Sequence, residues 1–489
     1  MSHSLVLAGG RVVDPETGFD RVCDVGIDGG SVSAVGDRLD GATTVDVRGL
    51  VVAPGFVDLY SHAQTLPGRR LQACDGVTTA LDLEAGRAPV ELAYSREAKR
   101  GSPINYGFSA SWAAARMHVI ADTPLDGSAA AIFGGLAGAE WQHAATAAQV
   151  ARILDQISSD LAAGAVGVGV LIGYTSGVDP AEYLAVAELA AAAGVPTFTH
   201  SRDIVEFAPE TSIDGAEEVV RAAGTTGAHM HYCHINSTSG RHIDRVLALV
   251  GRCQAEGARV TTEAYPYGSG STAIGAAFLA PEQLRQRFRS TTSITYLRTG
   301  ERIADEARLR ELRATDPGGL VIGEFLDESE PGDAAVLRRS LEFADAIVAS
   351  DAMPPLWTDT ADMDLSVWPL PPEAVTHPRT AGTFGRALRL WRQEGEPLIE
   401  AVRRATLLPA EVLQGAVPAM RRKGRVQTGT DADLIVFDEA RVTDQATYVA
   451  STRPSSGITH VIVGGTFVVR DSELVPDVLP GSPVRASPR

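Results

Sequence analysis

Residues 54–62, PGFVDLYSH, join a short apolar strand to a polar run that carries a histidine. A buried strand that ends in polar side chains is typical of the carboxyl end of a parallel sheet, where α/β enzymes place their functional groups. Two histidines spaced two residues apart would form a metal-binding pair at this end. Tyr60 occupies the first of these positions and His62 the second, so the stretch predicts a modified metal site.

Seven further apolar segments follow this strand, and Ala-rich segments with helical periodicity separate most of them, for example residues 179–194. Eight strands alternating with helices predict an α/β fold, a (β/α)8 TIM barrel, with a doubly wound sheet as the alternative. The eight predicted strands are residues 52–59, 77–84, 104–110, 165–172, 195–201, 228–235, 259–265 and 346–352.

The two ends of the chain differ from this middle part, because glycine pairs there punctuate short alternating apolar runs, as in hairpins. Residues 1–52 and 424–489 therefore predict one small β-sandwich domain formed by both chain termini. The barrel is expected over residues 53–423, with an insertion at about residues 280–340.

The composition narrows the classes of partner. The net charge of −18 disfavours nucleic acid and anionic membranes, because their phosphates would be repelled, and it favours a soluble protein. The expected partner is a small-molecule substrate. We find no basic leader and no apolar run of about 20 residues, which predicts a cytoplasmic protein; a homo-oligomer is compatible with the sequence. No metal-binding spacing connects the four cysteines, which are expected to be reduced: Cys23, Cys74, Cys233 and Cys253.

The carboxyl ends of five predicted strands carry side chains suited to a divalent cation such as zinc. Each alone is weak evidence, because a histidine at a strand end is more often a hydrogen-bonded structural residue. Asp82 is a rival to Glu84 on the same face of its strand, and His229 and His231 are expected to be packed rather than to bind metal. The argument depends on the set, which follows barrel order: His62, Glu84, His200, His234 and Asp351.

Several motifs along nearly the whole chain resemble the amidohydrolase superfamily, and within it the D-aminoacylase (N-acyl-D-amino acid deacylase) branch. PGFVD and GTDADLIVFD are typical of the superfamily, whereas YPY and HPRTAGTFGR are more specific to the branch. The other matching stretches are GVTTALDLEAG, THSRD, CHINSTSG and ASDA.

The resemblance implies hydrolysis of an amide by water that one or two zinc ions activate. It assigns His200 and His234 to the more tightly bound metal, His62 to a second and weaker position, and Asp351 to the roles of general base and then acid. Many superfamily members bridge two metals with a barrel lysine, but the only lysines here are Lys99 and Lys423, outside the predicted strands.

Three departures from the branch pattern matter for function. Tyr60 replaces the first histidine of the pair, which predicts one metal ion rather than two and leaves the phenol free to bind substrate or water. Glu84 replaces the bridging cysteine that D-aminoacylases use, Ala85 being at that place. Asn236 stands where the pattern has a lysine that contacts the substrate carboxylate. Arg379, Tyr174 and Tyr265 are further candidates for substrate binding, with packing or ion pairing as the alternative.

We therefore expect a metal-dependent hydrolase of a C–N bond other than a peptide bond, in an N-acyl amino acid or peptide-like small molecule. The alternative is a lyase, isomerase or cyclase on the same scaffold, as used in bacterial secondary metabolism. An inert binding protein is disfavoured by the polar residues kept at the strand ends. Zinc is the expected cofactor, and another divalent metal would also fit.

Overall fold

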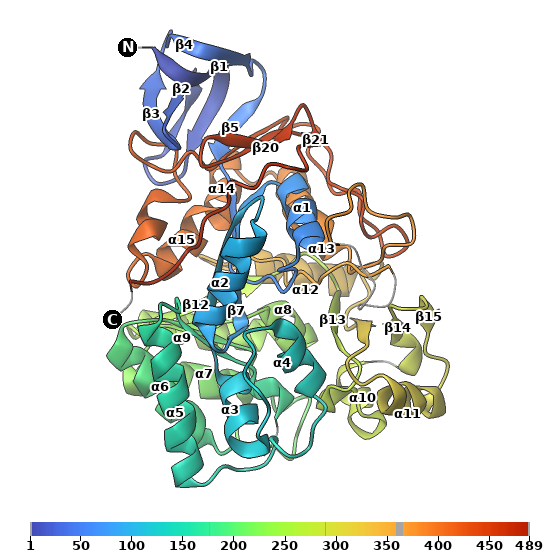
Figure 1. Ribbon diagram of the computed structural model, residues 1–489. Coiled ribbons are helices and arrows are strands. Elements are labelled where there is room, and N and C mark those ends of the chain that lie inside the picture. Colours follow the sequence, from blue (N-terminus) through green and yellow to red (C-terminus); the bar gives the residue numbers. More distant parts are fainter. Residues whose placement is uncertain (1, 176, 289, 358–364, 488–489) are drawn as a thin grey trace. The chain divides into compact units, whose positions relative to one another are not determined.

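The computed structural model describes residues 2–175, 177–288, 290–357 and 365–487. The chain divides into two compact units. The first unit contains the residues up to Leu81, Arg96–Gly107 and Ile347–Arg485, and the second contains Asp82–Ser95, Phe108–Ala346 and the C-terminal residues from Ala486. Figure 1 shows their helices and strands in sequence colours.

An eight-stranded sheet confirms the predicted (β/α)8 barrel, because every predicted strand is present. Neighbours in the sheet follow chain order, and the pairings recorded between neighbouring strands are parallel. The ring closes beyond the first and last strands, where Ser61 pairs with Ala352 in a parallel bridge and His62 N donates to Ala352 O at 2.8 Å. The strands are β6 (Phe56–Asp58), β7 (Val77–Arg87), β8 (Asn105–Ser111), β9 (Val168–Val170), β10 (Thr197–Thr199), β11 (Met230–Tyr232), β12 (Val260–Ala264) and β17 (Ile347–Val348).

Local signals define the helices between these strands. The predicted helix after β9 is α6 (Pro180–Ala193): Asp179 caps its N-terminus by accepting from Ala181 N, and Gly194 ends it at a φ of 62°, which suits glycine. The other described α-helices of the barrel part are α1 (Leu66–Cys74), α2 (Val90–Arg100), α3 (Trp112–Ala121), α4 (Ala129–Gly135), α5 (Ala147–Ala162), α7 (Gly215–Thr226), α8 (Ile235–Ser239), α9 (Ile243–Ala255), α12 (Pro331–Glu342), α13 (Arg379–Glu394), α14 (Leu398–Ala405) and α15 (Leu407–Leu413).

A small antiparallel sheet lies between β12 and β17 in the sequence, within the second unit. Its strand order is β13-β16-β14-β15, and two helices, α10 (Pro281–Arg287) and α11 (Glu306–Thr315), accompany it. The first strand begins before residue 280, where we expected the insertion to start, and the predicted limits remain a prediction. The strands are β13 (Ser269–Ala273), β14 (Ile294–Tyr296), β15 (Glu301–Arg302) and β16 (Leu320–Glu324).

Both chain termini form a separate nine-stranded sheet in the first unit, as predicted for the small β domain. The N-terminal and C-terminal parts meet where β5 pairs antiparallel with β18, and Figure 1 shows the two parts, blue and red, at the same end of the unit. Buried valines and leucines fill its core. The strands are β1 (His3–Asp14), β2 (Phe19–Asp28), β3 (Ser31–Gly36), β4 (Gly41–Asp46), β5 (Val51–Pro54), β18 (Leu434–Phe437), β19 (Ile458–Val463), β20 (Thr466–Arg470) and β21 (Glu473–Leu474).

The buried Lys423 pairs with two carboxylates of the motif GTDADLIVFD, one of which also contacts barrel strand β8. Its ammonium group lies 2.6 Å from Asp433 and 3.0 Å from Asp431. The Asp433 carboxylate also accepts from Asn105 on β8 at 2.8 Å. Such a buried carboxylate needs all of these donors, because an unpaired charge in the interior is costly.

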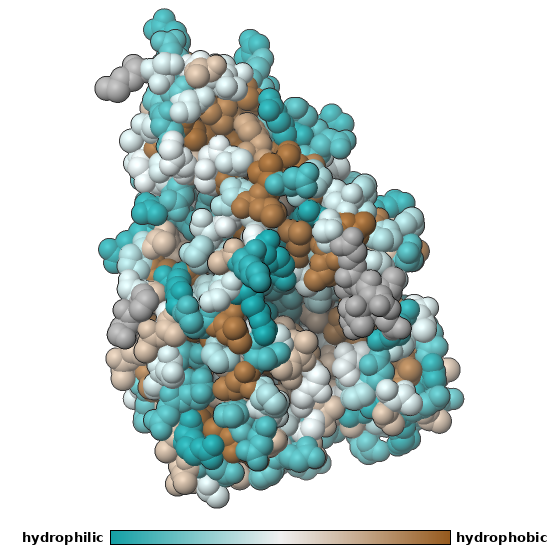
Figure 2. Space-filling model, viewed as in Figure 1, coloured by the Kyte–Doolittle hydropathy of each residue, from teal (hydrophilic) through white to brown (hydrophobic). Residues whose placement is uncertain are grey.

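The helices in the described part of the chain include none that is long and apolar enough to cross a membrane. Figure 2 shows hydrophilic residues spread over most of the viewed face, with apolar residues in separate groups.

Candidate active site

Three of the four predicted metal ligands converge in the second unit. Glu84 Oε1 lies 3.0 Å from His200 Nδ1 and 2.8 Å from His234 Nε2, and the two nitrogens are 3.1 Å apart. All three side chains are buried, and they form a group that could hold a metal ion.

Each of these three residues stands at or near the carboxyl end of its strand. Glu84 lies within β7, His200 directly follows β10, and His234 follows β11 as the N-cap residue of α8. His234 has a φ of 33°, a left-handed conformation that non-glycine residues adopt rarely and at a cost of about 1–3 kcal/mol. Ser237 Oγ lies 2.9 Å from its Nδ1, which fixes the ring with Nε2 toward Glu84.

The ionisation of the cluster suits metal binding. Burial opposes the charge of Glu84, but the adjacent His200 and His234 outweigh it and hold the pKa of this carboxyl well below its ordinary value. Burial lowers the pKa of His200 to about 4, so its ring is neutral near pH 7. The cluster therefore offers one anionic oxygen and a neutral imidazole, the forms in which these groups bind metal.

The spacing of the donor atoms fits a cation better than a set of hydrogen bonds. Ligands about 2.0–2.1 Å from a tetrahedral zinc ion stand roughly 3.3 Å apart, close to the observed triangle. Without a cation, Glu84 Oε1 would accept one hydrogen bond from His200 and one from His234. Both donor nitrogens would then carry a hydrogen although they lie only 3.1 Å apart. The residues present therefore fit a divalent metal.

Aromatic side chains cover the His200 side of the cluster. Tyr174 is centred 4.7 Å from the His200 ring, and Phe278 from the small antiparallel sheet region is 5.3 Å from Tyr174. Gly173 permits this approach, because a Cβ there would lie 2.4 Å from His200 Cδ2. The Tyr174 hydroxyl lies 3.0 Å from Thr272 Oγ1 on β13, so the small antiparallel sheet contributes to this wall.

The other predicted substrate residues of this unit lie on the His234 side. The Tyr265 ring is centred 6.4 Å from the His234 ring. Asn236 is fully buried, and its side-chain amide donates to Tyr265 O at 3.1 Å and to Tyr267 O at 3.4 Å. A direct contact between Asn236 and substrate stays a prediction.

Asp82, the rival to Glu84, forms a buried ion pair with Arg87 at 2.5 Å. It does not belong to the group of donor atoms that Glu84 completes among the described residues. The structure therefore favours Glu84 over Asp82 as the carboxylate of the cluster.

The first unit holds the remaining predicted site residues, which follow β6 and β17 or begin α13. The Tyr60 and His62 rings meet edge to face at 4.9 Å. Asp351 Oδ2 lies 2.8 Å from Arg379 Nη2, and Arg379 is fully buried. The roles of Tyr60 and Asp351 in catalysis, of His62 in metal binding and of Arg379 in substrate binding stay predictions.

Sequence reasoning missed the buried carboxyl of Glu263 on β12. Glu263 Oε2 lies 3.0 Å from His231 Nε2, and these two residues form with Cys233 a second group of metal-ligand type. The alternation of His229 and His231 predicted packing, and both contact Thr261 Oγ1, at 2.9 and 2.8 Å. The neighbouring alternation of Thr261 and Glu263 on β12 was the signal that would have found this contact.

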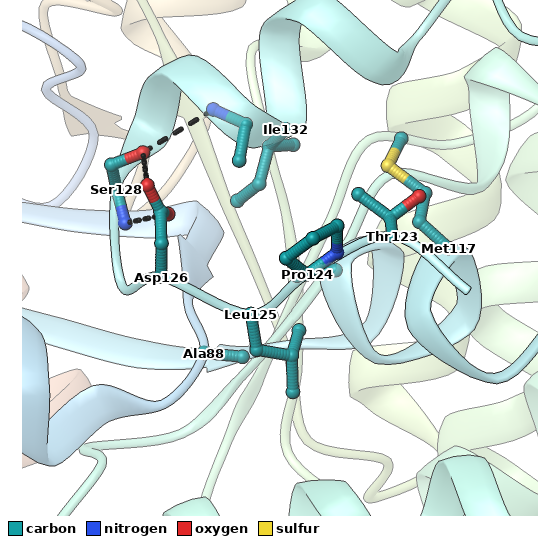
Figure 3. Close-up of a pocket in the computed structure, with 10 residues that line it drawn as sticks. Ala88, Met117, Thr123, Pro124, Leu125, Asp126, Ser128 and Ile132 are labelled. Carbon is teal, nitrogen blue, oxygen red and sulfur yellow. Dashed lines mark hydrogen bonds between the residues drawn. The ribbon is translucent and has the colours of Figure 1, made fainter. Parts of the chain in front are cut away.

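Figure 3 shows a pocket in the second unit that carries none of the predicted site residues. Thr123, Pro124 and Leu125 line it, and Ser128 at its rim accepts from Ala131 N to cap α4. Its volume of about 10 Å³ has room for roughly one water molecule.

Comparison with known proteins identifies the family. The N-acyl-D-glutamate deacylase of Alcaligenes xylosoxydans xylosoxydans is 30% identical over 508 residues, which cover 95% of this chain and 93% of the relative. The chain belongs to the N-acyl-D-amino acid deacylase (D-aminoacylase) family of amidohydrolases. The D-aminoacylase of the same organism is 28% identical over 95% of this chain and 94% of its own length. No protein-family model matches the chain.

Solved structures agree with this family. The N-acyl-D-glutamate deacylase of Bordetella bronchiseptica, in complex with zinc and a phosphonate inhibitor, superposes with a TM-score of 0.78 and 25% identity, covering 99% of this chain and all of that one. A D-aminoacylase structure with 23% identity and a TM-score of 0.77 over 99% of this chain and 100% of that one supports the fold.

Family membership decides between the functional hypotheses. The protein is an amidohydrolase that acts on a carbon–nitrogen bond other than a peptide bond in a small molecule, and the lyase, isomerase or cyclase alternative is not supported. The relatives and the donor cluster together support a divalent metal cofactor.

Proposed function

We propose that the protein is a deacylase of N-acyl-D-amino acids or closely related compounds, with one zinc ion held by Glu84, His200 and His234. The observation that carries the proposal is the triangle of three buried donor atoms in the second unit. Two imidazoles and one carboxylate are a ligand set of catalytic zinc enzymes, which leave the fourth position open. Names of relatives such as N-acyl-D-glutamate deacylase and D-aminoacylase suggest the substrate class.

When bound, the metal would lower the pKa of a coordinated water and polarise the scissile carbonyl. The protein prepares this chemistry by keeping His200 neutral and Glu84 ionised. Burial of all three ligands limits access of bulk water, which strengthens the electrostatic effect of the charged groups.

Asp351 is proposed to take a proton from the attacking water and to give it to the leaving amine. Its position after β17 supports this role, because catalytic groups of such barrels stand at the carboxyl ends of strands. A positioned general base typically contributes about 10²–10⁴-fold to the rate. We propose that Tyr60 contacts substrate or water, and that His62 alone holds a second metal too weakly for full occupancy.

The aromatic wall of Tyr174 and Phe278 is proposed to contact the part of the substrate nearest to His200. Both rings pack beside His200, and Phe278 lies between β13 and α10, so changes there would alter substrate preference while leaving the metal ligands in place. Tyr265 is proposed to form the opposite side, beside His234.

The test is a substrate panel with the zinc-reconstituted enzyme. N-acetyl derivatives of D- and L-glutamate, aspartate, leucine and methionine are incubated, and the released amine and acetate are quantified. We expect hydrolysis of one or more D-compounds, with products that gain the mass of one water, and loss of about 10²–10⁴-fold in Asp351→Asn with zinc content unchanged. Preference for the L-series, or near-native turnover by Asp351→Asn, would overturn the respective part of the proposal.

A further inference from the structure

The aspartate of the PGFVD motif is a fully buried carboxylate that accepts hydrogen bonds at both oxygens. Asp58 Oδ1 accepts from Ser350 N at 2.9 Å and from Tyr60 N at 3.2 Å. Asp58 Oδ2 accepts from Gln72 Nε2 at 2.7 Å and from the Ser350 hydroxyl. All of these residues belong to the first unit. The buried carboxylate is tolerated because donors satisfy both of its oxygens.

Two side-chain turns meet at this carboxylate. In the first, Asp58 accepts from the backbone of Tyr60, two positions further on, which makes an Asx turn at the end of β6. In the second, Ser350 Oγ accepts from Ala352 N at 3.0 Å, which is the equivalent turn of a serine, after β17. Asp351 is the residue that the second turn encloses. One carboxylate is therefore bound to the turns that carry Tyr60 and Asp351.

The backbone of Asp351 depends on such support. Its φ of 50° lies in the left-handed region, which residues other than glycine adopt at a cost equivalent to about 5–150-fold in population. A conformation of this kind persists only where the surrounding contacts fix it. The Ser350 hydroxyl fixes it here, because it accepts from Ala352 N beyond Asp351 and donates to Asp58 on β6.

We propose that Asp58 is a positioning residue for the proton transfer and acts on Asp351 through Ser350. The proposal rests on the proposed role of Asp351 as general base. Both Asp58 oxygens accept from protein donors, so we assign this carboxylate to the turn and not to substrate binding. The PGFVD motif thereby contributes to the reaction as well as to the fold.

Removal of the serine hydroxyl is the direct test. In Ser350→Ala, Ala352 N loses this acceptor and Asp58 Oδ2 loses a donor, so Asp351 leaves its strained conformation for part of the time. The cost of that conformation sets the scale: kcat should fall by about 5–150-fold, with KM changed by less than about 3-fold. Zinc content should not change, because the three proposed ligands lie in the second unit. Native kcat in a folded Ser350→Ala would overturn the inference.

Asp58→Asn tests the carboxylate itself. Asparagine keeps one acceptor oxygen for the two backbone N–H groups, but it replaces Oδ2, which accepts from the Ser350 hydroxyl, with an NH2 group. The loss of kcat should therefore resemble that of Ser350→Ala. The double variant should lose little more than either single variant, because both changes break the same contact. Losses that multiply in the double variant would show two independent effects and count against the inference.

An Asp351→Asn background and a matched control separate positioning from general damage. Ser350→Ala should lower kcat by less than about 2-fold when residue 351 is already asparagine, because no base is left to position. Ser102→Ala is the control, since it removes a fully buried hydroxyl of the same unit, which donates to Ile104 O at 2.6 Å. The control should keep kcat near the native value. Equal losses in the Ser102 and Ser350 variants would show mere destabilisation and overturn the inference.

The outcomes separate the inference from the proposed function. If Asp351→Asn loses activity while Ser350→Ala and Asp58→Asn keep native kcat, the function stands and the inference fails. If Asp351→Asn keeps near-native turnover, or no compound of the panel is hydrolysed, the proposed function fails and the inference falls with it. Should Ser350→Ala not fold, Asp58→Asn decides by the same measurement of kcat and KM, because it keeps the shape of the buried side chain.

Discussion

Replacing Glu84 with glutamine should remove most of the metal affinity without changing the shape of the site. Glutamine keeps the size of the side chain but not its charge, and Glu84 is the only anionic donor of the cluster among the described residues. Structural zinc sites with four ligands bind with about 10–16 kcal/mol, or roughly 2.5–4 kcal/mol for each ligand. The loss of one ligand should therefore weaken binding by about 10²–10³-fold.

The assay is competition of the purified protein with a fluorescent chelator for zinc, followed by metal analysis after dialysis. Glu91→Gln is the matched control, because it removes the same charge from an exposed position of α2 in the same unit. We expect the Glu91 variant to bind zinc like the native protein, and circular dichroism should show both variants folded. Native zinc affinity in Glu84→Gln would refute the assignment of Glu84 as a ligand.

Three further changes test other parts of the structure. Tyr60→His should raise the bound zinc from about one ion per chain toward two in excess metal, because it supplies the missing imidazole; metal analysis that already finds two tightly held ions in the native protein would contradict this. Burial lowers the pKa of His229 to about 3, below roughly 6.5 in the unfolded chain, so stability is lost as the pH falls: about 2 kcal/mol between pH 7 and 5. The loss of unfolding free energy between pH 7 and pH 5, measured with urea, should be smaller in His229→Gln than in the native protein. An equal loss would show that His229 does not cause this pH dependence. Lys423→Met should cost about 3–5 kcal/mol by leaving Asp433 without its buried cation, and an unchanged urea midpoint would count against that.

The sequence allowed prediction of those site residues that stand close to strand ends. Apolar runs alternating with helical segments locate the strands, and parallel strands bring their carboxyl ends to one rim. Glu84, His200 and His234 followed from this rule and meet as expected. The rule needs only the order of the elements, because each residue is at most two positions from its strand.

This rule does not predict contacts that depend on turns or on the small antiparallel sheet. The left-handed φ of His234 turns the ring toward Glu84, and nothing in the local sequence demands it. Phe278 reaches the aromatic wall from the segment after β13, whose place in space depends on the long-range pairing of the small antiparallel sheet. Whether Asn236 faces substrate or the backbone of Tyr265 likewise depends on the path of another turn.

The proposed use of Glu84 as a metal ligand, where the family pattern has a cysteine, has a consequence for the choice of metal. Thiolate is a soft ligand that selects zinc among the available divalent ions, whereas carboxylate with imidazole also suits manganese, iron and cobalt. The charge needed to hold the cation is retained, and the short contacts of Glu84 Oε1 to both rings keep the donor triangle compact. Loss of the thiolate should therefore broaden the range of metals that support activity rather than remove the metal requirement. The relative activity of cobalt- and manganese-loaded enzyme measures this directly, and a Glu84→Cys variant should narrow the range toward zinc.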